Sequence, residues 1–221
     1  MQTPARAPRR YRGISASERR ATRREQFLEA GLELFGTEGY AGTSIRAVSA
    51  AARLNSRYFY ESFASREDLL YHVYRGIMTD LAVQAAAAVA AAEGIDGKAR
   101  AGLRVGWTVL TEDRRKARII AIEVVGVSER LEHLRREFRH QLADVTVQGA
   151  LSVAPQGIRL RLDPVLTARA LMGGVVEVLA DWINGDVDAS VEDVVEHFTV
   201  MFTATAYASV VPPEPPVLRD S

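Results

Sequence analysis

Cysteine is absent from the 221 residues of this chain. Disulfides, thiolate metal sites and cysteine nucleophiles are therefore excluded. No apolar run approaches the roughly 18 residues that a membrane-spanning helix needs, and the basic N-terminus lacks the apolar core of a secretory signal. These absences favour a cytoplasmic protein that has no membrane partner.

Common catalytic motifs are also missing: the chain has no glycine-rich phosphate loop, no G-x-S-x-G and no HExxH. We therefore expect no catalytic residue, no cofactor and no enzymatic activity, with a helical-bundle enzyme that lacks any motif as the alternative. His133, Glu137 and His140 could share one helix face, as zinc ligands do. An exposed charged face is favoured instead by three neighbouring arginines, Arg135, Arg136 and Arg139, so no metal is expected.

The net charge of zero hides a strong asymmetry. Residues 1–66 hold 12 arginines against 6 glutamates, which leaves 16 basic and 22 acidic residues for 67–221. Of those arginines, 8 fall within the first 24 residues, where Glu18 is the only acid. Such a split predicts that one end of the chain contacts a polyanion. A solvated basic tail is the simpler alternative.

Helix signals run through almost the whole sequence. A capping box between Ser15 and Glu18 starts a first helix that Gly39 stops. A similar pattern between Ser65 and Asp68 opens a long helix that continues into an alanine-rich tract. A turn is expected at 93–97, an ordered loop at 158–162, and further helices at 98–111, 113–126, 129–152, 164–184 and 190–209. Since no credible strand pair is present, the chain is predicted to be all-α.

The segment from Thr43 to Phe63 predicts a helix, a tight turn near 52–54 and another helix. Thr43 is a good N-cap for the first of these helices. On the second, Leu54, Phe59 and Phe63 share one face and are expected to pack inward. Polar and aromatic side chains remain for the outside, where they suit phosphate and base-edge contacts in a major groove. The alternative is that Tyr58 and Tyr60 are half-buried packing residues.

The segment TSIRAVSAAARLNSRYFYESFASREDLL, residues 43–70, resembles the DNA-binding module of the tetracycline-repressor (TetR) family. The preceding FLEAGLELFGTEGY looks like the first helix of that family, and 115–137 and 168–186 resemble its effector domain more weakly. The resemblance implies a three-helix helix-turn-helix domain and a C-terminal helical bundle that binds an effector and dimerises. The expected boundaries are a disordered basic arm at 1–14, the DNA-binding domain at 15–64, the effector domain at 65–211 and a disordered tail at 212–221.

The resemblance also implies a set of DNA-contacting residues: Thr43, Ser44, Asn55, Ser56, Arg57, Tyr58, Tyr60 and Arg66. In this set Thr43 and Ser44 would offer a helix N-terminus to phosphate, and Arg66 falls where the family often has a phosphate-touching lysine. Two departures stand out. Arg53 occupies a turn position where many members have glycine, so the turn must avoid a positive φ or tolerate its cost. Arg57 and Tyr58 replace a common small Gly-Thr pair, so the operator sequence of a typical member cannot be transferred to this chain.

The C-terminal part is expected to form a homodimer and to receive the signal. Helix 164–184 is apolar nearly all round, which indicates burial on more than one side. Together with helix 190–209 it would give a four-helix interface with two-fold symmetry, although both helices could instead complete the core of one chain. The candidate ligand-binding residues combine apolar walls with a few polar groups, as many pockets and many helical cores do: Arg104, Trp107, Glu123, Phe138, Gln141 and Met172.

The sequence thus predicts a transcriptional regulator, specifically a repressor that binds a palindromic double-stranded DNA operator as a dimer. A small apolar or amphipathic effector would release it. The alternative is a DNA-binding regulator of the same fold that has no small-molecule ligand and is controlled by protein partners.

Overall fold

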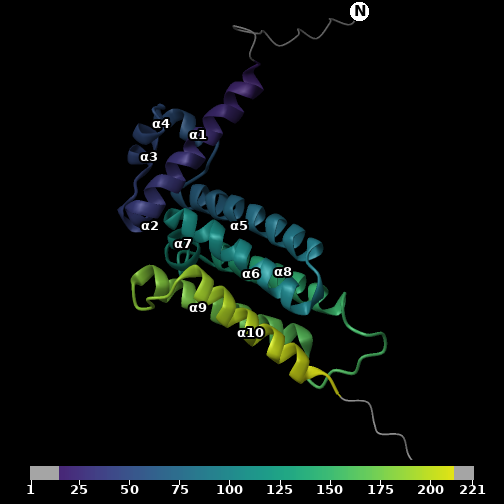
Figure 1. The fold of residues 1–221 in the computed structure, drawn as a ribbon. Helices are drawn as coiled ribbons and strands as arrows, with labels where there is room; N and C mark the ends of the chain where they lie inside the picture. Colours follow the sequence, from purple (N-terminus) through teal and green to yellow (C-terminus); the bar gives the residue numbers. More distant parts are fainter. Residues whose placement is uncertain (1–14, 212–221) are drawn as a thin grey trace, which may run out of the picture. The chain divides into compact units, whose positions relative to one another are not determined.

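The computed structural model describes residues 15–211, so the predicted arm at 1–14 and tail at 212–221 lie outside the described residues. The described part folds into ten α-helices and one π-helix, with no strand beyond an isolated bridge between Leu160 and Val210, and the all-α prediction is confirmed (Figure 1). The elements are α1 (Ala16–Thr37), α2 (Gly39–Gly42), α3 (Ile45–Ala51), α4 (Ser56–Tyr60), α5 (Arg66–Ala91), α6 (Gly94–Glu112), α7 (Arg114–Arg118), the π-helix η1 (Ile119–Glu123), α8 (Glu129–Leu151), α9 (Pro164–Asn184) and α10 (Val191–Ser209).

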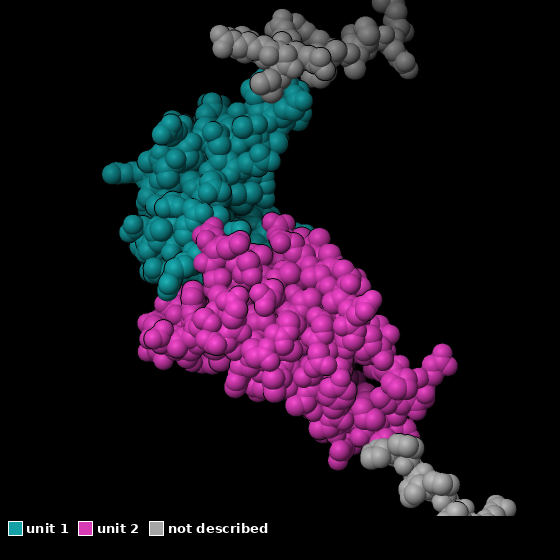
Figure 2. All heavy atoms as spheres, viewed as in Figure 1, with its two compact units in different colours: residues 1–77, 114–132 teal, residues 78–113, 133–221 magenta. Residues whose placement is uncertain are grey.

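Packing divides the chain into two compact units (Figure 2). Unit 1 comprises 1–77 and 114–132, and unit 2 comprises 78–113 and 133–221. The chain therefore passes between the units within α5, between α6 and α7, and within α8. The functional division at residue 65 stays a prediction, because the units are defined by packing and not by function.

Unit 1 begins with the predicted capping box. The Ser15 hydroxyl accepts the Glu18 N–H at 3.1 Å, and the Glu18 carboxylate accepts the Ser15 N–H in return. The predicted cap of α3 is wrong by one residue: Ser44, and not Thr43, accepts the Ala47 N–H at 3.1 Å. Thr43 is buried, and its hydroxyl donates to carbonyls nearer the N-terminus.

The turn between α3 and α4 takes the left-handed conformation that glycine usually supplies. Arg53 has φ of 55°, the only positive φ at a non-glycine residue in the described chain. Such a conformation costs an L-residue roughly 1–2 kcal/mol. The turn therefore tolerates the cost instead of avoiding it.

The prediction of one helix over 113–126 is wrong. A short α7 gives way to η1, and Gly126 with φ of 70° follows. The i,i+5 spacing of a π-helix is supported twice here: the Val124 N–H donates to the Ile119 carbonyl at 3.3 Å, and Arg118 Nε donates to Glu123 Oε1 at 2.8 Å. Periodicity of 3.6 residues could not indicate this wider turn.

Unit 2 is built from the end of α5 with α6, α8, α9 and α10. The predicted turn at 93–97 is also wrong, because the break between α5 and α6 is confined to Ala92 and Glu93 and α6 begins at Gly94, where φ is 63°. The predicted starts of α9 and α10 are confirmed by the Asp163 cap with Pro164 in the first turn and by the Ser190 capping box. Among the described residues, no helix is long and apolar enough to cross a membrane.

Gly36 gives a test of the packing in unit 1. A Cβ at Gly36 would lie 2.3 Å from the Arg115 Cβ and 2.7 Å from the Arg115 Cα. We expect Gly36→Ala to lower the free energy of unfolding, because overpacking of about 1–3 kcal/mol outweighs the helix-propensity gain of about 1 kcal/mol. Gly76→Ala in α5 is the control, since its Cβ would meet nothing within 4 Å and should stabilise the helix. Urea denaturation measures both, and equal stabilisation by the two changes would contradict the packing.

Candidate nucleic-acid interface

The predicted recognition helix, α4, is only five residues long and is held in place by aromatic packing. Phe27 of α1 meets Phe59 edge-on at 5.4 Å and Phe63 at 6.4 Å between ring centroids, and all three rings are buried. A helix this short is unstable alone. Its orientation therefore comes from the burial of Phe59, and this confirms the predicted inward face.

The residues beside Phe59 are left at the surface. The Arg57 side chain is 81% exposed and Tyr60 is 63% exposed. Asn55 caps the helix, its Oδ1 accepting the Arg57 N–H at 2.9 Å, and Ser56 is half-buried. The surface of α4 thus exposes a guanidinium and a phenol.

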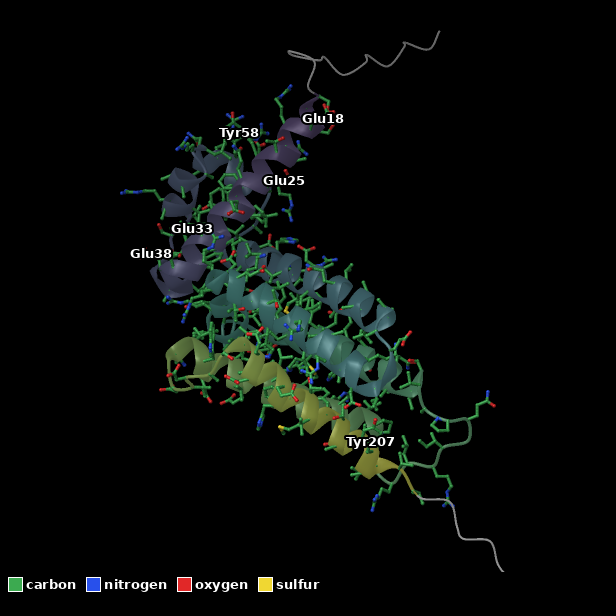
Figure 3. All side chains as sticks on the ribbon, in the orientation of Figure 1. Glu18, Glu25, Glu33, Glu38, Tyr58 and Tyr207 are labelled. Carbon is green, nitrogen blue, oxygen red and sulfur yellow. The ribbon has the colours of Figure 1, made fainter. Side chains whose placement is uncertain are left out.

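Tyr58, labelled in Figure 3, is half-buried, and a neighbouring arginine stacks on its ring. The Arg23 guanidinium of α1 lies 4.4 Å above the Tyr58 ring centroid, and Arg57 lies 5.9 Å from the same centroid. Arg23 also donates to Glu61 Oε2 at 3.2 Å. Tyr58 is thus half-buried, as the packing alternative predicted, but it is not fully covered. Its contact with DNA stays a prediction.

Two arginines of the basic N-terminal run make intramolecular contacts that stabilise the helix-turn-helix module. Besides Arg23, Arg24 donates to the Ser62 carbonyl at 2.9 Å and stacks 4.4 Å above the Phe63 ring. Sequence reasoning assigned both to the polyanion-facing charge and did not single out Glu61. The i,i+4 spacing of Arg57 and Glu61, whose charged atoms are 4.0 Å apart, was an available signal. No local spacing could have found Arg23, which is 38 residues from Glu61.

The flanking phosphate candidates have different surroundings. Thr43 donates its hydroxyl to the Gly39 and Leu34 carbonyls and its N–H to the Tyr40 carbonyl, so both of its donors are engaged within the module and its phosphate contact stays a prediction. Ser44 is exposed. Arg66 donates to the Thr43 carbonyl and stacks 4.1 Å above the Tyr40 ring, so it braces the module whatever else it contacts.

The start of α5 is fixed by Asp68. Its carboxylate accepts the Ala64 N–H at 3.1 Å and an Arg130 Nη1–H at 2.8 Å. Burial alone would raise the pKa of Asp68, but these hydrogen bonds lower it below the ordinary value. The carboxylate stays ionised, and its hydrogen bond to the Ala64 N–H ties the segment between α4 and α5 to the first turn of α5.

The candidate ligand residues are divided between the two units. Glu123 belongs to unit 1, where its carboxylate accepts the Tyr40 N–H at 2.7 Å and Arg118 Nε at 2.8 Å, so its evident task is to join η1 to α2. The other five belong to unit 2: Trp107 and Phe138 are buried, Met172 is half-buried, and Arg104 and Gln141 are exposed. Arg104 pairs with Glu192 at 3.4 Å.

Trp107 differs from the other candidates in its hydrogen bonding. The residue is 2% exposed, and its Nε1–H has no hydrogen-bond partner in the described chain. Trp182 meets it edge-on at 6.2 Å, and the Trp182 Nε1–H donates to the Ala189 carbonyl at 3.1 Å. The orphaned donor is thus specific to Trp107.

Residues 27–73 match the family model described as bacterial regulatory proteins, tetR family. This module is therefore that of the TetR family. The matched residues run from Phe27 through α4 into α5, and so include the aromatic cluster and the exposed face of α4. No curated protein matches the chain.

Solved structures share the TetR fold along most of the chain. A putative TetR-family regulator from Syntrophomonas wolfei is 18% identical with a TM-score of 0.71, covering 89% of this chain and 98% of that one. FadR from Bacillus subtilis, in complex with stearoyl-CoA, is 16% identical with a TM-score of 0.72, covering 80% and 96%. AibR, in complex with isovaleryl coenzyme A and operator DNA, is 21% identical with a TM-score of 0.63, covering 81% and 97%. At these identities the likeness establishes the fold.

The exposed face of α4 can be tested by truncation. We expect Arg57→Ala and Tyr58→Ala each to reduce discrimination between the preferred duplex and random DNA, by on the order of 1–3 kcal/mol for a lost base contact. Arg46→Ala in α3 is the control, since it removes an exposed arginine outside α4. Fluorescence anisotropy at matched salt measures both affinities. Unchanged discrimination in Tyr58→Ala would show that Tyr58 does not read sequence.

Proposed function

We propose that this TetR-family regulator is a repressor that binds a palindromic operator as a homodimer and is released by a small apolar or amphipathic effector. The observation that carries the DNA-binding part is the α4 surface, where Phe59 is buried and Arg57 and Tyr60 are exposed. A guanidinium and phenols on one short helix suit base-edge and phosphate contacts in a major groove.

The dimer is supported by apolar surface that one chain leaves uncovered. Only Ala168 and Leu179 of the apolar helix α9 are buried, and Leu166 is 70% exposed. On α10, Val200 is 54% exposed, with Met201 beside it also exposed. Two-fold pairing of these helices would cover that surface and place two recognition helices on one duplex. Such a dimer reads successive major grooves when the helices are about 34–36 Å apart.

Val200 tests the dimer interface. We expect Val200→Glu to raise the dimer dissociation constant by more than about 100-fold, since an unpaired charge buried in an interface costs roughly 3–5 kcal/mol. Val83→Glu is the matched control, because Val83 on α5 is 65% exposed and lies outside α9 and α10. Sedimentation equilibrium measures both. Equal effects of the two changes, or none from Val200→Glu, would place the interface elsewhere.

The effector part of the proposal is supported by Trp107. A buried indole N–H without a partner costs about 1–3 kcal/mol, and a ligand that carries an acceptor oxygen would remove that cost. The B. subtilis FadR and AibR structures contain acyl-CoA molecules, which are amphipathic and carry carbonyl oxygens. We therefore propose an amphipathic effector with an acceptor group, and stearoyl-CoA and isovaleryl-CoA are suitable first probes.

We propose that effector binding is transmitted to the DNA-binding module through two stretches of chain that belong to both units, α5 and the segment from α6 into 114–132. Helix α5 starts in the DNA-binding module, where Arg66 holds the Thr43 carbonyl, and its later part belongs to unit 2. The segment 114–132 packs with α1 in unit 1, and α6 leads directly into it. A ligand that prefers the DNA-incompetent geometry of these helices needs a coupling of only about 1–3 kcal/mol to weaken DNA binding about 5–150-fold.

Linkage provides the experiment for the effector. Each probe, followed by hits from thermal-shift screening, is titrated into free protein and into protein saturated with its selected operator duplex. For an inducer we expect an affinity about 5–150-fold weaker in the presence of operator, because the coupling is reciprocal. Equal affinities would rule out that molecule as an inducer. A screen that found only such molecules would favour control by protein partners.

A further inference from the structure

Arg23 of α1 stacks on Tyr58 and is held there by Glu61, which follows the end of α4. Arg23 donates to Glu61 Oε2 at 3.2 Å while its guanidinium lies 4.4 Å above the Tyr58 ring. Their side chains are 23% and 32% exposed, so the pair is partly shielded from water. A planar guanidinium can lie flat on a ring and donate in-plane hydrogen bonds to a carboxylate at the same time, whereas an ammonium has no plane to stack.

This pair is poorly suited to contact phosphate directly. Glu61 neutralises the Arg23 charge locally, and a carboxylate next to the DNA-facing surface repels a polyanion. The pair therefore adds little net attraction to DNA. Its geometry suits the control of a side-chain orientation instead.

Glu61 interacts with two arginines, Arg23 closely and Arg57 at a longer distance. Arg23 is hydrogen-bonded to one carboxylate oxygen, whereas Arg57 Nε lies 4.0 Å from the other and its side chain is 81% exposed. Exposed pairs at such distances contribute little. Arg57 can thus leave Glu61 for DNA while Arg23 keeps its place over Tyr58.

We propose that Arg23 and Glu61 are positioning residues that fix the Tyr58 ring, an arrangement we call the clamp, and thereby set DNA sequence choice. The proposal rests on the proposed DNA-binding function and deepens it. Tyr58 stands on a helix of five residues, so its own backbone holds the ring only weakly. Stacking by Arg23, itself fixed by Glu61, pre-organises the ring before DNA arrives, and pre-organisation improves discrimination by reducing the ordering cost on binding.

The test uses full-length protein and duplexes selected from a random pool by the wild type. Arg23→Lys keeps the charge but loses the planar stacking, and Glu61→Gln keeps the size but loses the charge. Arg20→Lys and Glu25→Gln, both at exposed positions of α1, are the matched controls. Affinities for the selected duplex and for random duplex are measured across a salt series, and thermal melts confirm that each variant is folded.

We expect Arg23→Lys to lower discrimination about 3- to 30-fold, the range expected for loss of a partly desolvated cation–π contact, with an unchanged salt slope. Glu61→Gln should lower discrimination while tightening binding to random duplex, because an acid is removed. In a Tyr58→Ala background, neither change should lower discrimination further. The two controls should leave discrimination unchanged.

Three results would overturn the clamp. Discrimination could stay unchanged in both variants, Arg23→Lys could weaken selected and random DNA equally, or the effects could persist in the Tyr58→Ala background. A wild-type protein that selects no duplex from the pool would overturn the proposed function and the clamp together. Selection by the wild type with unaffected variants would overturn the clamp alone.

Discussion

Phe27 of α1 contacts Phe59 and Phe63 edge-on, and this buried aromatic cluster decides which side chains of α4 can meet DNA. Successive residues of a helix are about 100° apart, so burying Phe59 turns its neighbours on both sides away from the core. A helix of five residues has no stability of its own with which to resist another orientation. The exposed face of α4, which we propose contacts DNA, is therefore a consequence of core packing, and α1 supports it.

Charge in this module has two uses that the sequence does not distinguish. Arg24 satisfies the Ser62 carbonyl and covers Phe63, and Arg23 covers Tyr58, so two cations of the N-terminal run are bound to the fold. Arg57 is almost fully exposed. A count of arginines thus overstates the positive charge available to a phosphate backbone. In our proposal, sequence choice depends on where each guanidinium is held, since a bound arginine positions a neighbour and an exposed one contacts DNA.

The features predicted correctly from the sequence are local ones. The capping boxes at Ser15 and Ser190 and the inward face carrying Phe59 follow from residues within a turn or two of each other. Two of the errors arise where groups distant in the sequence interact. Glu123 accepts the N–H of Tyr40, 83 residues away, in the segment where a π-helix replaces the expected α-helix, and the hydroxyl of Thr43 turns back to α1 instead of capping α3. The stacking of Arg23 on Tyr58 belongs to the same class, because periodicity carries no information about it.

Unit 2 contains two features that a single chain leaves incomplete, and they differ in kind. The exposed apolar residues of α9 and α10 form an extended surface, which non-directional burial against another protein surface can satisfy. The Trp107 N–H is a single buried donor, which only an acceptor atom at a fixed position can satisfy. A protein partner suits the first and a small molecule with an oxygen acceptor suits the second. This difference is the physical reason for assigning assembly to α9 and α10 and signal reception to the surroundings of Trp107 in our proposal.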